Sequence, residues 1–244
     1  MDHTPYFRSC PDCETSVLLI HGILSTPRHF DFLIPHIPEN YQVKSILLAG
    51  HGGSMRDFSK ASMKQWQAQV RQEIEHLRTP NIIIIGHSLG ALLALQAATC
   101  CKRIQGLFLL NVPFIPQMRF SGMCRCLRIA FGRVRTDDPI DIACYQDLGI
   151  RTEPYLWKYL RWIPNFISLL CFARQCRKIP ASLKIPCTAF LGTNDELVHI
   201  RSRRYLTGNP HISLQILENG IHYGYTKSQQ HQITSHWENF IKTI

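Results

Sequence analysis

The chain has 244 residues, 45% of them hydrophobic, and a formal net charge of +10 at pH 7. This length fits one domain with room for an inserted subdomain, and the apolar fraction is sufficient for a large core. Because no run of about 18 apolar residues occurs, the composition argues against a membrane-spanning helix.

The first fifteen residues are polar and contain Cys10 and Cys13, two of the ten cysteines. They show no basic start followed by an apolar run, so we expect no signal peptide and a cytoplasmic protein whose cysteines stay reduced. Cys10 with Cys13, and Cys124 with Cys126, have spacings that metal ligands use. Neither pair has a second C-x-x-C or an H-x-x-x-H beside it, and we therefore expect no metal site.

Short apolar runs alternate with segments of helical periodicity along most of the chain. The runs expected to form strands are residues 16–20, 43–48, 82–85, 107–110, 188–191 and 213–217. The segments expected to form helices are residues 27–37, 61–77, 89–101, 200–206 and 228–241. This alternation predicts an α/β fold with a doubly wound, mostly parallel sheet and helices on both faces.

Between residues 113 and 186 the alternation stops, because no strand pattern occurs there. Residues 124–131, 139–148 and 154–173 are instead expected to form helices separated by prolines. We therefore predict a core domain of residues 1–113 and 184–244, interrupted by a helical cap insertion of residues 114–183. The cap is expected at the carboxyl-terminal edge of the sheet, where such folds place their active sites.

The expected cap is basic and rich in apolar side chains. Eleven Lys or Arg and five Asp or Glu lie between Pro113 and Pro180, and apolar residues cluster between Tyr155 and Phe172. The charge fits a solvated basic face, or a surface near lipid headgroups or an anionic substrate. Without a nucleic-acid motif, we expect no nucleic-acid partner. The apolar cluster fits either the packing face of the insertion or a cap that contacts an acyl chain or a membrane.

A serine flanked by glycines follows the expected strand of residues 82–85. The pentapeptide GHSLG at residues 86–90, with Ser88 at its centre, lies between four isoleucines and a Leu/Ala-rich helical run. This is the context of a nucleophile elbow, a sharp strand-to-helix turn that exposes the serine oxygen. Side chains at positions 86 and 90 would crowd such a turn, which explains the two glycines. The alternative is a serine in an ordinary glycine-rich turn.

A serine nucleophile needs a general base, and the base needs a carboxylate that orients it. Both should follow later strands, in the order serine, acid, histidine. Of the five histidines after residue 190, only His222 lies in the loop directly after the last expected strand. Asp195 lies just past the preceding strand, with Glu196 as the alternative acid. We therefore predict a catalytic triad of Ser88, Asp195 and His222.

The oxyanion of a tetrahedral intermediate needs two backbone N–H groups to stabilise it. Leu89, the residue after the nucleophile, would supply one of them. Ile23 would supply the other, because the first expected strand ends in His21-Gly22 and Gly22 lets the backbone turn toward the site. We expect His21 to be a structural loop histidine.

Five segments of the chain resemble α/β-hydrolases of the serine esterase and monoacylglycerol lipase type. They are residues 19–22 (LIHG), 49–54 (AGHGGS), 86–90 (GHSLG), 194–196 (NDE) and 220–222 (GIH). The resemblance implies the α/β-hydrolase fold, the triad and oxyanion-hole residues predicted above, and no metal or organic cofactor. Two features depart from the family. Ile221 separates Gly220 from His222, and the segment before Ser16 is short enough to lack one or two opening strands.

The triad and the resemblance together predict a serine hydrolase that cleaves short-to-medium acyl esters or monoacylglycerols through an acyl-enzyme. Its partner would be a small-molecule ester or lipid-like substrate, with membrane contact through the cap as one interpretation. The same triad serves thioesterases, amidases, aminopeptidases and C–C hydrolases, so these stay open. A non-catalytic binding module is a further alternative. Haloalkane dehalogenases and epoxide hydrolases place Asp where this chain has Ser88, which excludes them.

Overall fold

A seven-stranded sheet forms the centre of the molecule, with the strand order β1-β3-β2-β4-β5-β6-β7. The computed structural model describes residues 3–244, without the side chains of residues 130, 139 and 156, so residues 1–2 of the polar N-terminal segment lie outside it. The strands are β1 (Tyr6–Arg8), β2 (Thr15–Ile20), β3 (Gln42–Ile46), β4 (Asn81–His87), β5 (Ile104–Leu110), β6 (Cys187–Gly192) and β7 (Ile212–Leu217). Strand β1 pairs antiparallel with β3, and the other neighbours pair in parallel. The predicted mostly parallel α/β fold is confirmed.

Strand β4 is buried on both of its faces. Ile82 and Ile84 pack into one hydrophobic cluster, whereas Ile83 and Ile85 pack into a second cluster on the opposite face of the sheet. Side chains alternate between the two faces of a strand, so both faces of this strand must be covered by helices. The run of four isoleucines in the sequence therefore reflects burial from both sides.

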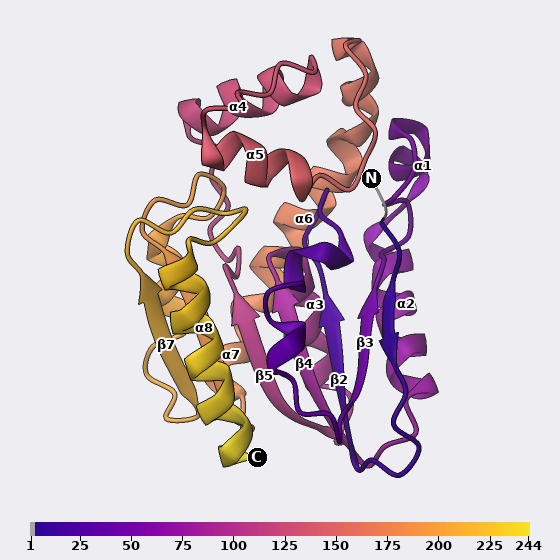
Figure 1. Ribbon diagram of the computed structural model, residues 1–244, viewed down its shortest axis with the longest axis vertical. Coiled ribbons are helices and arrows are strands. Elements are labelled where there is room, and N and C mark those ends of the chain that lie inside the picture. Colours follow the sequence, from indigo (N-terminus) through magenta and orange to yellow (C-terminus); the bar gives the residue numbers. More distant parts are fainter. Residues whose placement is uncertain (1–2) are drawn as a thin grey trace.

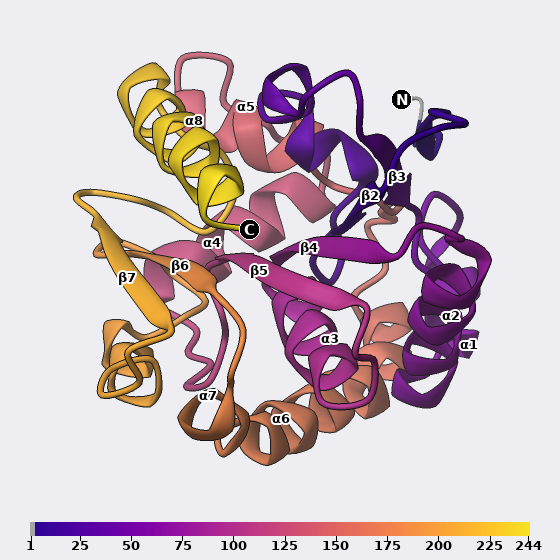
Figure 2. The same ribbon diagram turned by 90° about the horizontal axis from the view of Figure 1, so that it is seen from below.

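Helices cover the two faces of the sheet (Figure 2). One face carries α2 (Met63–His76), α3 (Leu89–Ala98), α6 (Ile163–Cys176) and α7 (Ile179–Ser182). The other carries α8 (Lys227–Phe240), which continues into a 3₁₀ turn (Ile241–Thr243), and two further 3₁₀ turns, Pro27–Phe30 and Ile34–His36. Trp66 of α2 and Trp237 of α8 are fully buried in the two layers. Aromatic side chains of this size supply much of the apolar area that each layer buries.

The segment between β5 and β6 contains α4 (Phe120–Ala130), α5 (Pro139–Gln146), a 3₁₀ helix (Leu156–Trp162), α6 and α7. Figure 1 shows α4 and α5 above the carboxyl ends of the strands, whereas α6 runs down beside the sheet. Trp162, Leu169 and Phe172 pack into the same cluster as side chains of α2 and α3. The division into a core domain and a cap of residues 114–183 stays a prediction. In the described part of the chain, no helix is both long and apolar enough to cross a membrane.

The structure corrects three expected helices and adds further elements. Residues 154–173 form a 3₁₀ helix (Leu156–Trp162) followed by α6, which extends to Cys176, rather than one helix. Residues 27–37 form two short 3₁₀ turns instead of one helix, because Pro35 lacks the N–H that a continuous helix would need. Residues 200–206 form a 3₁₀ helix, Ile200–Tyr205, rather than an α-helix. The additions include the opening strand β1, the short helix α7, and helix α1 (Met55–Lys60), which begins at a capping box of Ser54 and Asp57.

Candidate active site

Ser88 lies at the turn between the end of β4 and the start of α3. Its backbone has φ 52° and ψ −115°, a region that residues other than glycine rarely adopt. The two flanking glycines make the turn sterically feasible. A Cβ at Gly86 would lie 2.7 Å from the backbone of Ala91, and a Cβ at Gly90 would overlap the carbonyl group of Ile20. The turn therefore has the geometry of a nucleophile elbow.

Replacing Gly90 with alanine should lower the free energy of unfolding by about 3 kcal/mol or more, because the core around it is already close-packed. The new methyl group would overlap a backbone carbonyl of β2, which is held by its pairing with β3 and β4. Urea unfolding against the wild type measures the loss. Gly132→Ala is the control, since Gly132 has φ 67° and open space around it, so only the left-handed backbone costs energy, about 1 kcal/mol. Equal unfolding midpoints for Gly90→Ala and the wild type would contradict this packing.

His222 and Asp195 lie beside Ser88 and form a continuous hydrogen-bonded chain with it. His222 Nε2 lies 3.1 Å from Ser88 Oγ, and His222 Nδ1 lies 2.8 Å from Asp195 Oδ2. The N–H groups of Leu197 and Val198 both donate to Asp195 Oδ1, at 2.8 Å. These two bonds fix the carboxylate, which in turn orients the imidazole so that Nε2 faces the serine hydroxyl. The structure thus brings the three predicted residues together.

Burial and charge act in opposite directions on the pKa of His222. Burial of the ring lowers this pKa, whereas the charge and hydrogen bond of Asp195, together with the charge of Glu196, raise it. The net effect raises the pKa of His222 above its ordinary value of 6.5. Beside it, burial holds the pKa of His87 well below the ordinary value. A neutral His87 donates from Nε2 to the carbonyl oxygen of His222 at 3.1 Å and so helps to fix the loop that carries His222.

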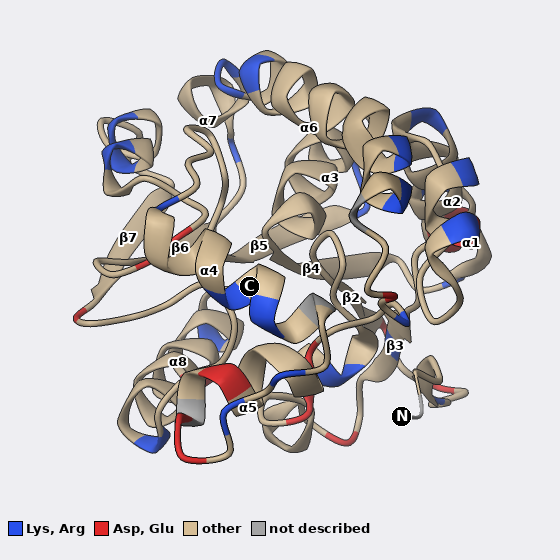
Figure 3. Cartoon of the chain, turned by 90° about the horizontal axis from the view of Figure 1, so that it is seen from above, with Lys and Arg blue, Asp and Glu red and all other residues tan. Residues whose placement is uncertain are grey.

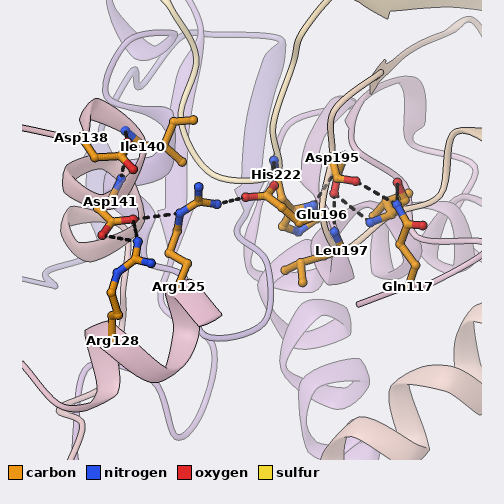
Figure 4. Close-up of polar contacts among 11 residues, drawn as sticks. Gln117, Arg125, Arg128, Asp138, Ile140, Asp141, Asp195, Glu196, Leu197 and His222 are labelled. Atoms are coloured by element: carbon orange, nitrogen blue, oxygen red, sulfur yellow. Dashed lines mark hydrogen bonds and ion pairs between the residues drawn. The ribbon is translucent and has the colours of Figure 1, made fainter. Parts of the chain in front are cut away.

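Glu196, the alternative acid, contacts the backbone of His222 instead of its imidazole. Its Oε2 accepts the N–H of His222 at 3.2 Å, and its Oε1 forms an ion pair with Arg125 of α4 (Figure 4). The Nε of Arg125 also donates to Asp141 of α5 at 2.9 Å, and the same carboxylate binds Arg128 at 2.7 Å. This buried network joins α4, α5 and the loop that carries His222.

Arg125, Arg128 and Asp141 were not among the residues predicted from the sequence. The link between Arg125 and Glu196 joins segments that are 71 residues apart, and no motif marks Arg125. The sequence contains one weak indication of this network. Arg125 and Arg128 are three residues apart and therefore face the same side of a helix. Nothing in the sequence indicates which carboxylate such a pair would meet.

The loop after β2, residues 22–25, lies against Ser88, since a Cβ at Gly22 would be 3.0 Å from the Cβ of Ser88. Leu24 has φ 60°, a left-handed conformation that is unfavourable for leucine. Its N–H donates to His51 Nε2 at 3.0 Å, and its carbonyl oxygen accepts the N–H of Gly149 at 2.7 Å. Ser25 Oγ donates to Asp147 Oδ2 at 2.9 Å. The bonds to residues 147 and 149, which follow α5, hold this loop in its strained form.

The two residues predicted to form the oxyanion hole lie on either side of the nucleophile. Ile23 lines the same cavity as Ser88, and Leu89 follows Ser88 as the first residue of α3. That the N–H groups of Ile23 and Leu89 form the oxyanion hole stays a prediction. His21 is fully buried, and its Nε2 accepts the N–H of Leu48 at 3.0 Å, which is the structural position expected for it.

A cavity of about 550 Å³ opens above Ser88 and His222. Most of the described lining residues lie between Pro116 and Leu170, on α4, α5, the 3₁₀ helix that follows α5, α6 and the loops between them. Most of the lining is apolar, and includes Ile129, Tyr159, Trp162, Phe166, Leu169 and Leu170. The two charged side chains among the described lining residues, Arg125 and Glu196, form an ion pair with each other. The cavity is therefore suited to an uncharged, apolar group placed next to the serine.

The amino-acid sequence was compared with those of known proteins and protein families. A family model described as the alpha/beta hydrolase family matches residues 17–230. A pimeloyl-[acyl-carrier protein] methyl ester esterase of Neisseria meningitidis serogroup A is 35% identical over 165 residues, which cover 66% of this chain and 45% of that protein. The chain thus spans about half the length of the curated relatives it matches.

Solved structures share the fold over nearly the whole chain. One, from a study of the metagenome-derived lipolytic enzymes LipS and LipT, has a TM-score of 0.74 at 19% identity and covers 99% of this chain and 98% of its own. A thioesterase domain from the curacin biosynthetic pathway has a TM-score of 0.63 at 19% identity and covers 98% of this chain and 94% of its own. At such identities the likeness concerns the fold alone.

Proposed function

Because the chain belongs to the alpha/beta hydrolase family, we propose that it is a serine hydrolase that cleaves carboxylic esters. The observation that carries this proposal is the hydrogen-bonded chain from Ser88 through His222 to Asp195 at the floor of an apolar cavity. Ser88 is the nucleophile, His222 the general base, and Asp195 orients and stabilises the imidazolium. The names of the curated relatives support ester chemistry, since the matched proteins are described as esterases.

Hydrolysis proceeds in two half-reactions. His222 Nε2 takes the proton of Ser88 Oγ as this oxygen attacks the ester carbonyl, and the N–H groups of Ile23 and Leu89 stabilise the oxyanion. The tetrahedral intermediate collapses to an acyl-enzyme, and the imidazolium returns the proton to the departing alcohol. Water then attacks the acyl-enzyme with His222 as base again, which releases the carboxylic acid and restores the Ser88 hydroxyl.

The cavity favours an ester whose acyl group is uncharged and apolar. Arg125 and Glu196 neutralise each other, so a charged acyl chain would find no unpaired partner on the described walls. Short-to-medium acyl esters and monoacylglycerols meet this requirement. Residues 114–183 act as the cap in this proposal, because most of the described lining residues belong to this segment.

A panel of substrates with the same acyl chain tests the proposal. The matched compounds are a p-nitrophenyl ester, an acyl-CoA thioester and an acyl anilide, each with butanoyl, octanoyl and palmitoyl groups. We expect the highest kcat/KM for the oxygen esters, with the butanoyl or octanoyl ester hydrolysed fastest. A thioester that is hydrolysed a hundredfold faster than its oxygen ester would assign the site to a thioesterase, and faster anilide cleavage would assign it to an amidase.

The pH dependence of kcat/KM should report the raised pKa of His222. The base must be neutral to accept the serine proton, so activity should fall as the pH decreases through the pKa of His222, with a midpoint above 6.5. Glu196→Gln removes a negative charge that raises this pKa, and should move the midpoint to lower pH. Initial rates between pH 5 and 9 measure both midpoints. A wild-type midpoint below 6.5, or a shift to higher pH in the variant, would contradict this electrostatic account.

A further inference from the structure

Exposed apolar side chains gather in one part of the molecule. Among the described side chains, sixteen large apolar ones are exposed, and thirteen of these lie between Met118 and Leu170. Monomeric proteins rarely leave so many large apolar groups together in water, and such concentrations mark interaction surfaces. The two segments that carry most of them form part of the walls of the cavity above Ser88.

Ten of the exposed side chains form two stripes on segments that also line the cavity. The first, on α4 and just after it, has the helical spacing of three or four residues and comprises Phe120, Met123, Leu127 and Phe131. The second, on the 3₁₀ helix and α6, comprises Trp157, Leu160, Ile163, Phe166, Ile167 and Leu170. We name these two stripes the apolar rim. Phe166 and Leu170 belong to both the rim and the cavity lining, so the rim is continuous with the cavity.

The side chains of the apolar rim are strongly exposed. Phe120 is 75% exposed and Leu160 is 63% exposed, which leaves their rings and branches largely in water. Figure 1 shows α4 and the start of α6 above the carboxyl ends of the strands, at the end of the molecule away from the C-terminus. The rim therefore lies at one end of the molecule, where a flat partner could cover both stripes together.

The segments that carry the apolar rim contain no acidic residue. Residues 114–136 and 154–183 have ten Lys or Arg and no Asp or Glu. The exposed cations among them are Arg119, Arg133, Arg135, Arg161, Arg174 and Lys178. Figure 3, which looks down on this end of the molecule, shows basic positions on α4 and on the stretch leading into α6, whereas acidic positions lie on α5 and beside it. The segments that carry the apolar rim therefore present exposed positive charge beside its apolar side chains.

We propose that the apolar rim docks on an anionic phospholipid surface, with the opening of the cavity toward the lipid. Apolar side chains flanked by Lys and Arg are the pattern that binds the interface of anionic bilayers. Each cation near such a surface adds attraction, and tryptophan favours the level of the headgroups, where Trp157 would lie. A second copy of the chain fits less well, because it would bring the positive charges of two rims face to face.

Docking in this orientation gives a lipid-like ester a short path to the nucleophile. The substrate would move from the bilayer between the two stripes into the apolar cavity without crossing water. This consequence rests on the proposed ester hydrolysis, whereas the docking itself does not. A binding measurement that does not depend on turnover therefore tests the docking separately from the ester hydrolysis.

Co-sedimentation of the whole protein with lipid vesicles tests the docking. We expect binding to phosphatidylcholine vesicles that contain phosphatidylglycerol to be at least tenfold tighter than binding to phosphatidylcholine alone. This preference should weaken as salt is raised from 0.05 to 0.5 M, because salt screens exposed charges. The triple variant Phe120→Gln, Leu160→Gln, Ile167→Gln should bind at least tenfold more weakly. None of these three residues lines the cavity, so turnover of a water-soluble ester should stay within about twofold of the wild type.

Phe7→Gln is the matched control, because Phe7 is 57% exposed but lies on the edge strand β1. It should bind vesicles as the wild type does. Equal binding to the two kinds of vesicle, or unchanged binding of the triple variant, would overturn the proposal. Binding to neither kind would also overturn it and favour an acidic protein partner. A wild-type dimer that the triple variant converts to monomers would assign the rim to a second copy.

A second variant, in which exposed arginines are replaced, tests the proposal if the apolar triple variant fails to fold. This variant combines Arg119→Gln, Arg161→Gln and Arg174→Gln. The three substitutions remove exposed charges and leave the residues that line the cavity unchanged. This variant should lose most of its preference for phosphatidylglycerol vesicles, while its circular dichroism spectrum stays that of the wild type. A preference that remained intact in the folded variant would overturn the proposal.

Discussion

Replacing Ser88 with alanine is expected to lower kcat/KM for ester hydrolysis by about 10⁴-fold or more. The hydroxyl is the group that forms the acyl-enzyme, so its loss removes the covalent route completely. Activity that remains would come from binding and oxyanion stabilisation of direct attack by water. Because Ser88 is only 3% exposed and its hydroxyl contacts His222, alanine fits the site without a new clash. Steady-state kinetics with a p-nitrophenyl ester measure the effect.

A serine away from the cavity provides the control for this variant. Ser16 is fully buried at the start of β2, where its hydroxyl donates to the side chain of Gln42 at 2.7 Å. Ser16→Ala removes this bond and the one that Ser16 Oγ accepts from the Thr79 hydroxyl at 2.8 Å. It should lower stability by about 2 kcal/mol, with kcat/KM unchanged. Ester hydrolysis that survived Ser88→Ala at more than a hundredth of the wild-type rate would contradict the role of this serine.

Replacing Asp195 with asparagine should lower kcat by about 10⁴-fold, the scale observed when a triad aspartate becomes an amide. The carboxylate accepts a hydrogen bond from Nδ1 of His222, which leaves Nε2 unprotonated and facing the serine. An amide NH₂ in the same place would favour the opposite tautomer, with a proton on Nε2. It would also lose the charge that raises the pKa of His222.

The adjacent Glu196 is the internal control for this prediction. Its carboxylate contacts the backbone N–H of His222, so Glu196→Gln should cost about tenfold or less, beyond the shift in pH midpoint described above. Parallel measurement of the two variants at the pH optimum of each distinguishes the two acids. Losses of equal size, or a larger loss for Glu196→Gln, would make Glu196 the residue that orients the imidazole.

The central strands and the position of the serine could be predicted because local sequence determines them. Four consecutive isoleucines favour a strand covered on both faces. Gly86 is required by the close approach of α3, and Gly90 by the close approach of β2. His222 and Asp195 could be singled out because parallel strands bring the loops at their carboxyl ends to one edge of the sheet. The structure places both beside Ser88, while their catalytic roles stay predictions.

Other features depend on contacts between distant segments, which local patterns do not encode. Strand β1 has three residues and owes its existence to pairing with β3. The ion pair of Arg125 with Glu196 requires α4 to lie over the β6 end of the sheet, a placement set by the packing of the whole insertion. The two 3₁₀ turns at residues 27–36 show a helical pattern in the sequence, but proline interrupts their backbone hydrogen bonds.

Labelling with a fluorophosphonate probe, followed by intact-protein and peptide mass analysis, tests the central claim most directly. Such a probe reacts only with a serine whose hydroxyl is activated by a neighbouring base. We expect one adduct per wild-type chain, located on Ser88, none on Ser88→Ala, and labelling at least a thousandfold slower on His222→Ala. No adduct on folded wild-type protein, or an adduct on another residue, would contradict the account of Ser88, His222 and Asp195 as one catalytic unit.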